Sequence, residues 1–379
     1  MTTVISGTST HVSQNTISRR GTGLLAIDRA AISEGYTLIT PIAERGDVYL
    51  IDTDGNVVHE WHLPYPPGRH ARLLPNGNLF YQGKLTGDEP LFPIWEVYHG
   101  GVFLEVTPSG QIVREAHHPR HHHDATILDN GNLILLTVEP LPSDQANLVV
   151  GGTPGTEAPG GTIWADVIVE MTWEGEILWK WAAADHLAFA DAPLDPHYAR
   201  EHWPMANTVN QTRDGDIIVG FRSASLVIRI DRHTNNINWT LNAPVVSQQH
   251  YPHELDNGNI LVFDNGSFRE GVSFPYSRAI EVDPATNQVV WEYKDNPPQN
   301  FYSPYMSSAS RLPNGNTLIA EGTFGRIFEV NREGTLAWEY VVPWFGSFGE
   351  GVGHDSSQGP NNSVFRAYRY SPDQVPWLS

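Results

Sequence analysis

Two short sequence patterns alternate along this chain, and they restrict its fold more than any other feature. In the first, an Asn-Gly or Asp-Gly turn separates two apolar runs; its five copies lie at 73–83, 127–137, 212–221, 254–266 and 311–322. In the second, a strand with an acidic residue leads through a turn to a strand that usually carries Trp; its six copies lie at 49–61, 103–115, 168–181, 228–239, 281–293 and 328–340. Asn, Asp and Gly tolerate the positive φ of a tight hairpin, so every copy predicts a β-hairpin.

One copy of each pattern gives a four-stranded antiparallel sheet, and repetition of such sheets predicts an all-β protein, a six-bladed β-propeller. The first blade lacks its own copy of the first pattern, and the strand-like segment 364–370 has no partner after it. We therefore expect this C-terminal strand to complete the first blade and close the ring. Residues 1–22 are expected to form a flexible arm and 23–379 one domain. Within it, 182–203 is the sizeable helix candidate and 150–161 a loop.

The composition argues against several classes of function. The chain has 379 residues, with 23 Lys and Arg against 43 Asp and Glu, a net charge of −20 that disfavours nucleic acid and anionic membranes as partners. No apolar run approaches the ~20 residues of a membrane span. The absence of Cys removes disulfides, thiolate catalysis and Cys-ligated zinc. Without a secretory pattern at the N-terminus, a cytoplasmic location is expected; the oligomeric state is not predicted.

The first pattern supplies the innermost strand of each blade, which lines the channel of a propeller. Seven residues before the Asn or Asp of each turn, every copy has a polar residue: Arg69, His123, Asn207, His250 and Ser307. Buried polar groups are costly unless they meet water, one another or a ligand. We therefore predict that these five side chains surround one axis, with the two histidines as catalytic residues and the other three as substrate-binding residues.

Histidines also cluster just before and within the third inner strand. We interpret His117, His118 and His121 as a solvated turn, in contrast to His123. A single metal bound by both His250 and His253 is disfavoured, because side chains three apart on a strand face opposite sides.

We predict a site without a cofactor. The alternative is a divalent metal held by His123, His250 and a third ligand. His253 is assigned to substrate binding. Arg222, between apolar and small neighbours, is suited to an anionic small molecule, since its guanidinium binds sulfate, phosphate or carboxylate bidentately.

Four segments together resemble the bacterial aryl-sulfate sulfotransferases: HHDATILDNGN at 122–132, NTVNQTRDGDIIVGFRSASLVIRIDR at 207–232, QHYPHELDNGNILVFDNG at 249–266 and NSVFRAYRYSPD at 362–373. The resemblance implies a six-bladed propeller that binds an aryl sulfate in its central funnel. It further implies that a histidine accepts the sulfuryl group and passes it to a phenol without a nucleotide donor. By this resemblance His250 is the nucleophile, His123 a second funnel histidine and Arg222 the sulfate-binding arginine.

The chain departs from the family at Met205, where the family pattern has another histidine. Loss of one charge-stabilising donor costs about 3–4 kcal/mol in a transition state. We therefore expect weak transfer from a chromogenic aryl sulfate, with another anionic small molecule as native substrate, unless His202, His253 or His354 takes its place. His354 is expected closer to His250 than His202 is, because its Gly-rich segment precedes the closing strand.

Two other functions compete with sulfuryl transfer. One is a lyase or hydratase in which His250 or His123 acts as general base and Arg222 holds a carboxylate. The other is a non-catalytic scaffold that binds protein partners on its faces, against which the convergent His and Arg residues argue.

Overall fold

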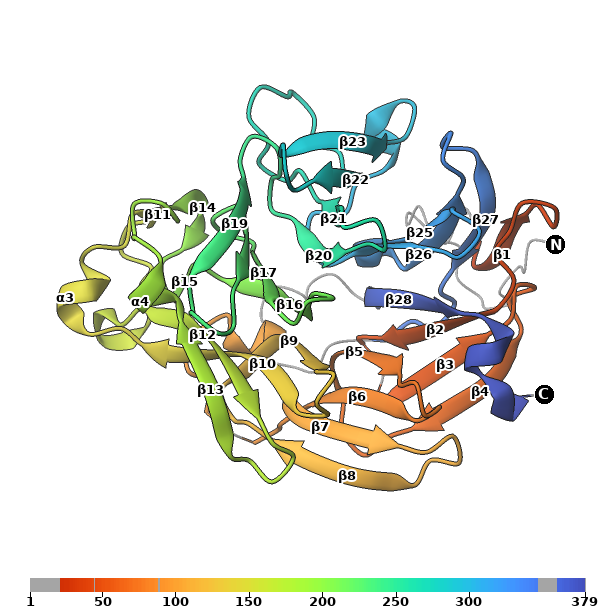
Figure 1. Ribbon diagram of the computed structural model, residues 1–379, viewed down its shortest axis with the longest axis horizontal. Coiled ribbons are helices and arrows are strands. Elements are labelled where there is room, and N and C mark those ends of the chain that lie inside the picture. Colours follow the sequence, from red (N-terminus) through yellow and green to blue (C-terminus); the bar gives the residue numbers. More distant parts are fainter. Residues whose placement is uncertain (1–20, 44, 88, 347–359, 379) are drawn as a thin grey trace, which may run out of the picture.

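The computed structural model describes residues 21–43, 45–87, 89–346 and 360–378. Six antiparallel sheets stand around a common centre, so the predicted six-bladed propeller is confirmed (Figure 1). Among the described residues, no helix combines the length and apolar character that crossing a membrane requires.

Each blade runs outward from an innermost strand near the axis. From that strand outward, blade 1 contains β28 (Val364–Tyr370), β2 (Tyr36–Pro41), β3 (Asp47–Ile51) and β4 (Val57–His62). Blade 2 contains β5 (Pro67–Leu73), β6 (Leu79–Lys84), β7 (Gly101–Val106) and β8 (Ile112–His117). Blade 3 contains β9 (His121–Ile127), β10 (Leu133–Pro140), β12 (Trp164–Met171) and β13 (Ile177–Ala182), with the short β15 (His202–Trp203) beside β12.

The other three blades repeat this order. Blade 4 contains β16 (Ala206–Gln211), β17 (Ile217–Phe221), β18 (Leu226–Ile230) and β19 (Ile237–Asn242). Blade 5 contains β20 (His250–Glu254), β21 (Ile260–Asp264), β22 (Arg278–Asp283) and β23 (Gln288–Tyr293). Blade 6 contains β24 (Ser308–Arg311), β25 (Thr317–Glu321), β26 (Arg326–Val330), β27 (Leu336–Val341) and β1 (Gly23–Ile27).

Both ends of the described chain close the ring. β28 pairs antiparallel with β2 and forms the innermost strand of blade 1, as predicted. β1 pairs with β27 and gives blade 6 a fifth, outermost strand, which the prediction of four-stranded blades missed. Because GLLAI carries neither repeated pattern, its pairing depends on the exposed edge of β27 rather than on a local turn.

The tryptophans of the second pattern join neighbouring blades. Trp338 of blade 6 donates its indole N–H to Thr53 O in blade 1 at 2.8 Å, across the junction where the ring closes. Trp61, Trp181 and Trp291 donate in the same way to a backbone carbonyl in a turn of the next blade, and Trp239 donates to the side-chain oxygen of Asn287. Trp61, Trp181 and Trp338 are buried in the blades, as expected, whereas Trp239 and Trp291 are only partly buried. Each indole also satisfies its one donor in the next blade.

The turn asparagines have a second role besides turn geometry. In blade 5, Asn257 and Asn259 donate to Glu281 Oε1 at 2.9 and 2.8 Å. Burial raises the pKa of Glu281, but these bonds and the nearby arginines outweigh burial and lower that pKa to about 2. Equivalent Asn pairs hold a buried Glu in three other blades, namely Glu105, Glu170 and Glu329.

Two expectations for the inserts are wrong. The segment 182–203 forms a single helical turn, α4 (Ala183–His186), followed by β14 (Leu194–Ala199), because Pro193 and Pro196 lack the N–H that a helix needs. β14 pairs with β11 (Gly151–Thr153), so the stretch 150–161 is not entirely loop. Among the described residues, the other short α-helices are α2 (Trp95–Tyr98) and α3 (Ser143–Ala146).

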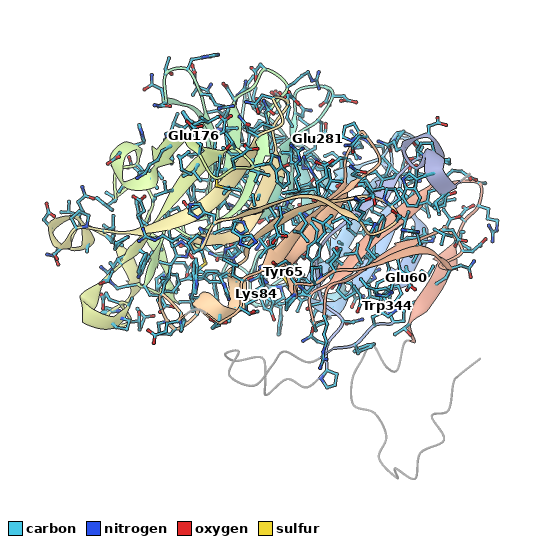
Figure 2. All side chains as sticks on the ribbon, turned by 90° about the horizontal axis from the view of Figure 1, so that it is seen from below. Glu60, Tyr65, Lys84, Glu176, Glu281 and Trp344 are labelled. Atoms are coloured by element: carbon cyan, nitrogen blue, oxygen red, sulfur yellow. The ribbon has the colours of Figure 1, made fainter. Side chains whose placement is uncertain are left out.

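Inner strands begin with irregular backbone on one face of the ring, which we call the site face. His123, Met205, Tyr251 and Met306 have φ of 52°, 64°, 53° and 60°, which non-glycine residues rarely adopt. Near these positions, a bulge interrupts the pairing of β9 with β10, and another interrupts the pairing of β20 with β21. Such bulges redirect side chains at the ends of strands. In side view, Tyr65, Lys84 and Trp344 lie toward the site face, and Glu176, in a blade 3 turn, lies toward the other (Figure 2).

Candidate active site

Three of the predicted residues lie near the starts of β5, β9 and β20, close enough for two of them to influence the pKa of the third, His123. Arg69, His123 and His250 are 7%, 6% and 2% exposed. Burial lowers the pKa of His123 well below its usual range, and the neighbouring His122 and the charge of Arg69 act in the same direction. His123 is therefore a neutral imidazole near a cationic side chain.

The tautomer of His250 follows from its neighbours. Asn265 donates its amide N–H groups to Ser303 O and Met306 O, so its Oδ1 faces His250 Nδ1 at 2.8 Å. Nδ1 must then carry the proton, and Nε2 carries the lone pair, which accepts the Met306 N–H at 3.2 Å. Burial and the charge of Arg222 lower the pKa of His250 well below its usual range. Nε2 is thus a free base.

Arg222 follows β17 and lies close enough to lower the pKa of His250 by its charge. Its guanidinium stands 5.0 Å from the centre of the Tyr198 ring and bonds Pro304 O at 3.4 Å. Nε of Arg222 is buried without a hydrogen-bond partner among the described residues. A buried guanidinium N–H in that state is suited to an anionic oxygen.

Tyr98 is a residue of this site that sequence reasoning missed. The segment between β6 and β7 contains α2 and stacks the Tyr98 ring on His123, with centroids 4.3 Å apart. The Tyr98 hydroxyl bonds His202 Nδ1 at 2.9 Å. Burial raises the pKa of Tyr98 well above its usual range, so it stays a donor. The segment lies outside the repeats, so no sequence pattern placed it over His123.

Met205 lies beside this aromatic group. It packs in an apolar cluster with Phe92, Trp95 and Tyr98, and Ser223 Oγ donates to its sulfur at 3.3 Å. His202 is fixed beneath the same tyrosine. The Tyr98 ring therefore covers His123 where Met205 offers no donor, and the Tyr98 hydroxyl is bonded to His202.

The other predicted residues have protein partners. Asn207 donates to Gln249 O at 2.8 Å, and Ser307 Oγ accepts the Gly322 N–H at 2.9 Å. His253 Nδ1 bonds Tyr251 O at 3.1 Å, and burial lowers its pKa to about 4. These contacts hold the strands in place, and a role for these residues in binding substrate remains a prediction.

The remaining histidines singled out from the sequence differ in their surroundings. His354 lies outside the described residues. The interpretation of His121 as solvated is wrong, because its ring is buried, packs edge-on against Phe103 and accepts the Gly101 N–H at Nδ1. His117 is exposed and bonds Glu115, as expected.

A second buried network, also unpredicted, joins three inner strands. Asp124 of β9 accepts two N–H groups of Arg366 from β28 at 3.0 and 2.6 Å, and bonds His70 of β5 at 2.9 Å. Burial lowers the pKa of His70 to about 4. The bidentate pair satisfies the aspartate fully, so this network stabilises the centre of the ring.

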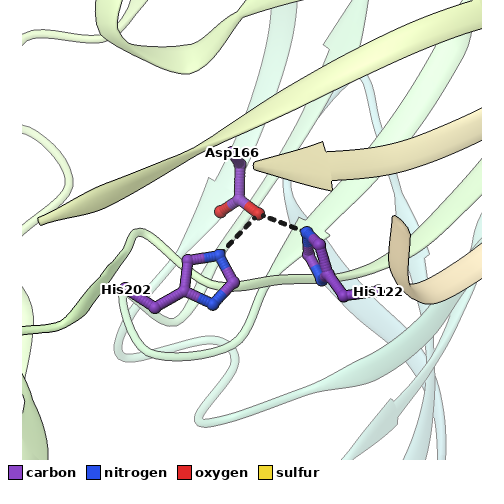
Figure 3. A group of neighbouring side chains, drawn as sticks. All are labelled: His122, Asp166 and His202. Atoms are coloured by element: carbon purple, nitrogen blue, oxygen red, sulfur yellow. Dashed lines mark hydrogen bonds and ion pairs between the residues drawn. The ribbon is translucent and has the colours of Figure 1, made fainter. Parts of the chain in front are cut away.

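Among the described residues, the group that could hold a metal ion is not the alternative considered from the sequence, His123 and His250 with a third ligand. Nε2 of His122 and Nε2 of His202 lie 3.1 and 3.0 Å from the same oxygen, Asp166 Oδ1, and the three residues are 0% exposed (Figure 3). Neither His123 nor His250 belongs to this group. Asp166 was not considered because it precedes the repeated pattern at 168–181.

Comparisons with known proteins agree with this picture. The family described as Arylsulfotransferase (ASST) matches residues 93–343, about two-thirds of the chain. No curated protein matches.

Solved structures with a similar fold are distant in sequence. A protein of unknown function from Bacteroides caccae is 15% identical, with a TM-score of 0.50, covering 81% of this chain and 94% of its own. Virginiamycin B lyase from Staphylococcus aureus is 12% identical, with a TM-score of 0.45 and coverage of 85% and 84%. The Bacteroides protein supports the fold, and neither likeness bears on activity.

Proposed function

Because this chain belongs to the arylsulfotransferase family, we propose that it transfers a sulfuryl group from an aryl sulfate to a hydroxyl acceptor, with His250 as nucleophile. The observation that carries this proposal is a neutral His250 with its lone pair on Nε2, within reach of the charge of Arg222, whose buried Nε has no hydrogen-bond partner among the described residues.

In the first half-reaction, Nε2 of His250 attacks the sulfur of the ester. The N–S bond forms while the bond between sulfur and the aryl oxygen breaks, and the phenolate leaves with that electron pair. The sulfuryl group replaces the Met306 N–H at Nε2. Asn265 Oδ1 holds the Nδ1 proton and stabilises the positive charge that develops on the ring.

In the second half-reaction, the oxygen of an acceptor hydroxyl attacks the same sulfur. The N–S bond breaks, its electron pair returns to Nε2, and the hydroxyl proton passes to solvent. The products are a new sulfate ester and the starting state of His250. The aryl sulfate itself donates the sulfuryl group that His250 passes on, so no nucleotide donor is needed.

Arg222 binds the sulfuryl oxygens in both half-reactions. Its charge is most useful where negative charge accumulates between nucleophile and leaving group. His123, stacked on Tyr98 and near Arg69, donates a hydrogen bond to the aryl oxygen as it leaves in this proposal. With Met205 in place of a family histidine, we expect slow turnover of simple aryl sulfates.

Initial rates with 4-nitrophenyl sulfate as donor and phenol as acceptor test this proposal. His250→Ala should abolish transfer, whereas His117→Gln, at an exposed histidine, should leave the rate unchanged. Arg222→Lys keeps the charge but loses the planar fork, and should lower kcat/KM by roughly 10–150-fold. A His250→Ala variant as fast as the wild type would remove His250 from the mechanism.

A further inference from the structure

We propose that His122, Asp166 and His202 bind one divalent transition-metal ion of the Zn²⁺ type, a site separate from the sulfuryl-transfer residues His250 and Arg222. The three residues come from β9, β12 and β15, which meet at the site face of blade 3. Two imidazoles and one carboxylate form the ligand set of catalytic zinc and non-haem iron centres.

The separations of the ligand atoms fit a common metal ion. Both Nε2 atoms lie 3.0–3.1 Å from Asp166 Oδ1, and all three atoms lie within 4.8 Å of one another. Metal–ligand bonds of about 2.0–2.2 Å place neighbouring ligand atoms about 3 Å apart. Figure 3 shows the two rings turned toward the same carboxylate oxygen, from opposite sides.

Hydrogen bonding alone leaves part of this group unsatisfied. His202 Nε2 is hydrogen-bonded to Asp166 Oδ1. His122 Nε2 is just as near that oxygen, yet within the part of the chain that the structure describes it is buried without a well-directed hydrogen bond. A buried nitrogen without a partner is costly, and a metal ion on its lone pair would remove that cost.

The outer nitrogens of both histidines are held as metal ligands usually are. His202 Nδ1 lies 2.9 Å from the Tyr98 hydroxyl, and His122 Nδ1 lies 2.9 Å from His123 Nδ1. The second carboxylate oxygen of Asp166 accepts the Ala206 N–H at 2.8 Å. Metal-bound histidines commonly donate the other ring N–H to such a partner, which fixes ring orientation.

The charge balance also distinguishes this aspartate from the other one buried near the axis. Asp124 has the bidentate Arg366. Among the described residues, Asp166 forms no ion pair with Arg or Lys, and its partners are the two imidazoles and one backbone N–H. A carboxylate removed from water needs a counter-charge, and a divalent ion would supply it.

A metal on His122 Nε2 has a consequence for the neighbouring residue. It places the His122 proton on Nδ1, which then donates to His123 Nδ1. Neutral His123 then carries its own proton on Nε2 and is a donor there.

The test is the metal content of the full-length protein purified from cultures supplemented with Co²⁺. The wild type should retain one equivalent of cobalt and show the visible absorption of Co²⁺ in a low-symmetry nitrogen and oxygen site. His202→Gln and Asp166→Asn should each lose the cobalt. His186→Gln, at an exposed histidine of blade 3 stacked on Trp181, should retain it.

A milder variant tests the proposal even if the ligand variants fold poorly. Tyr98→Phe removes one partner of His202 Nδ1 but no ligand, and competition with a chelator should show a 10–100-fold weaker site. Wild-type protein without stoichiometric cobalt would overturn the proposal. So would equal retention of cobalt by the wild type and folded His202→Gln or Asp166→Asn, or an unchanged chelator competition for Tyr98→Phe.

Discussion

At the residue scale, burial decides the protonation of His250. Its pKa lies well below the usual value of 6.5, first through burial and then through the charge of Arg222. An unperturbed imidazole, with a pKa of about 6.5, becomes protonated on this nitrogen as the pH falls through that value. In the folded protein the lone pair on Nε2 persists to lower pH.

This leads to a prediction for the pH profile. The acid limb of kcat/KM, which reports the free enzyme, should fall well below pH 6.5 in the wild type. Arg222→Gln removes one cause of the shift, so its acid limb should move toward higher pH, although burial keeps part of the shift. Profiles measured over pH 4–8 check this, and an identical acid limb in both proteins would show that Arg222 does not act on His250.

At the element scale, one contact between blades 6 and 1, where the ring closes, is the Trp338 indole bond to Thr53 O. Trp338→Phe keeps an aromatic ring in the core but loses this donor and some apolar contact. We expect a loss of about 1–3 kcal/mol in the free energy of unfolding, including the cost of an unsatisfied carbonyl. Urea unfolding measures it, and an unchanged midpoint would show that the bond contributes nothing.

The repeats also explain how far sequence reasoning reached. Turn chemistry is local, so Asn-Gly and Asp-Gly predicted the hairpins, and their count predicted the blades. Tyr98 and Asp166 have no counterpart in the repeats, and their approach to His123 and His122 depends on how the β6–β7 insert packs over blade 3. β1 was missed for a similar reason, since only the edge of β27 gives GLLAI a partner.

At the scale of the whole molecule, the C-terminal strand supplies the cation at the centre. Removing residues 364–379 deletes Arg366 and leaves Asp124 buried without its charge partner. Breaking a buried pair in this way costs about 3–5 kcal/mol, apart from the lost strand pairing. We expect this truncation to abolish cooperative thermal unfolding, whereas a chain ending at Tyr370 keeps β28 and unfolds cooperatively. Equal melting of the full chain and the 1–363 fragment would contradict this closure.

The buried histidines also give the fold a dependence on pH. Burial lowers the folded-state pKa of His70 and of His253 to about 4, from 6.5 in the unfolded chain. Below pH 6.5 the unfolded state therefore binds more protons than the folded state. Their contribution to stability is present above pH 6.5 and is lost progressively as pH falls toward 4. Denaturation midpoints at pH 7.5, 6, 5 and 4 check this, and a flat profile would contradict it.

The central claim is that His250 carries the sulfuryl group between donor and acceptor. Peptide mass spectrometry of the protein, after incubation with an aryl sulfate and no acceptor, tests this most directly. The account predicts one sulfuryl group on His250, its removal when phenol is added, and no label in His250→Ala. Transfer without any labelled peptide, or a label that stays in His250→Ala, would contradict it.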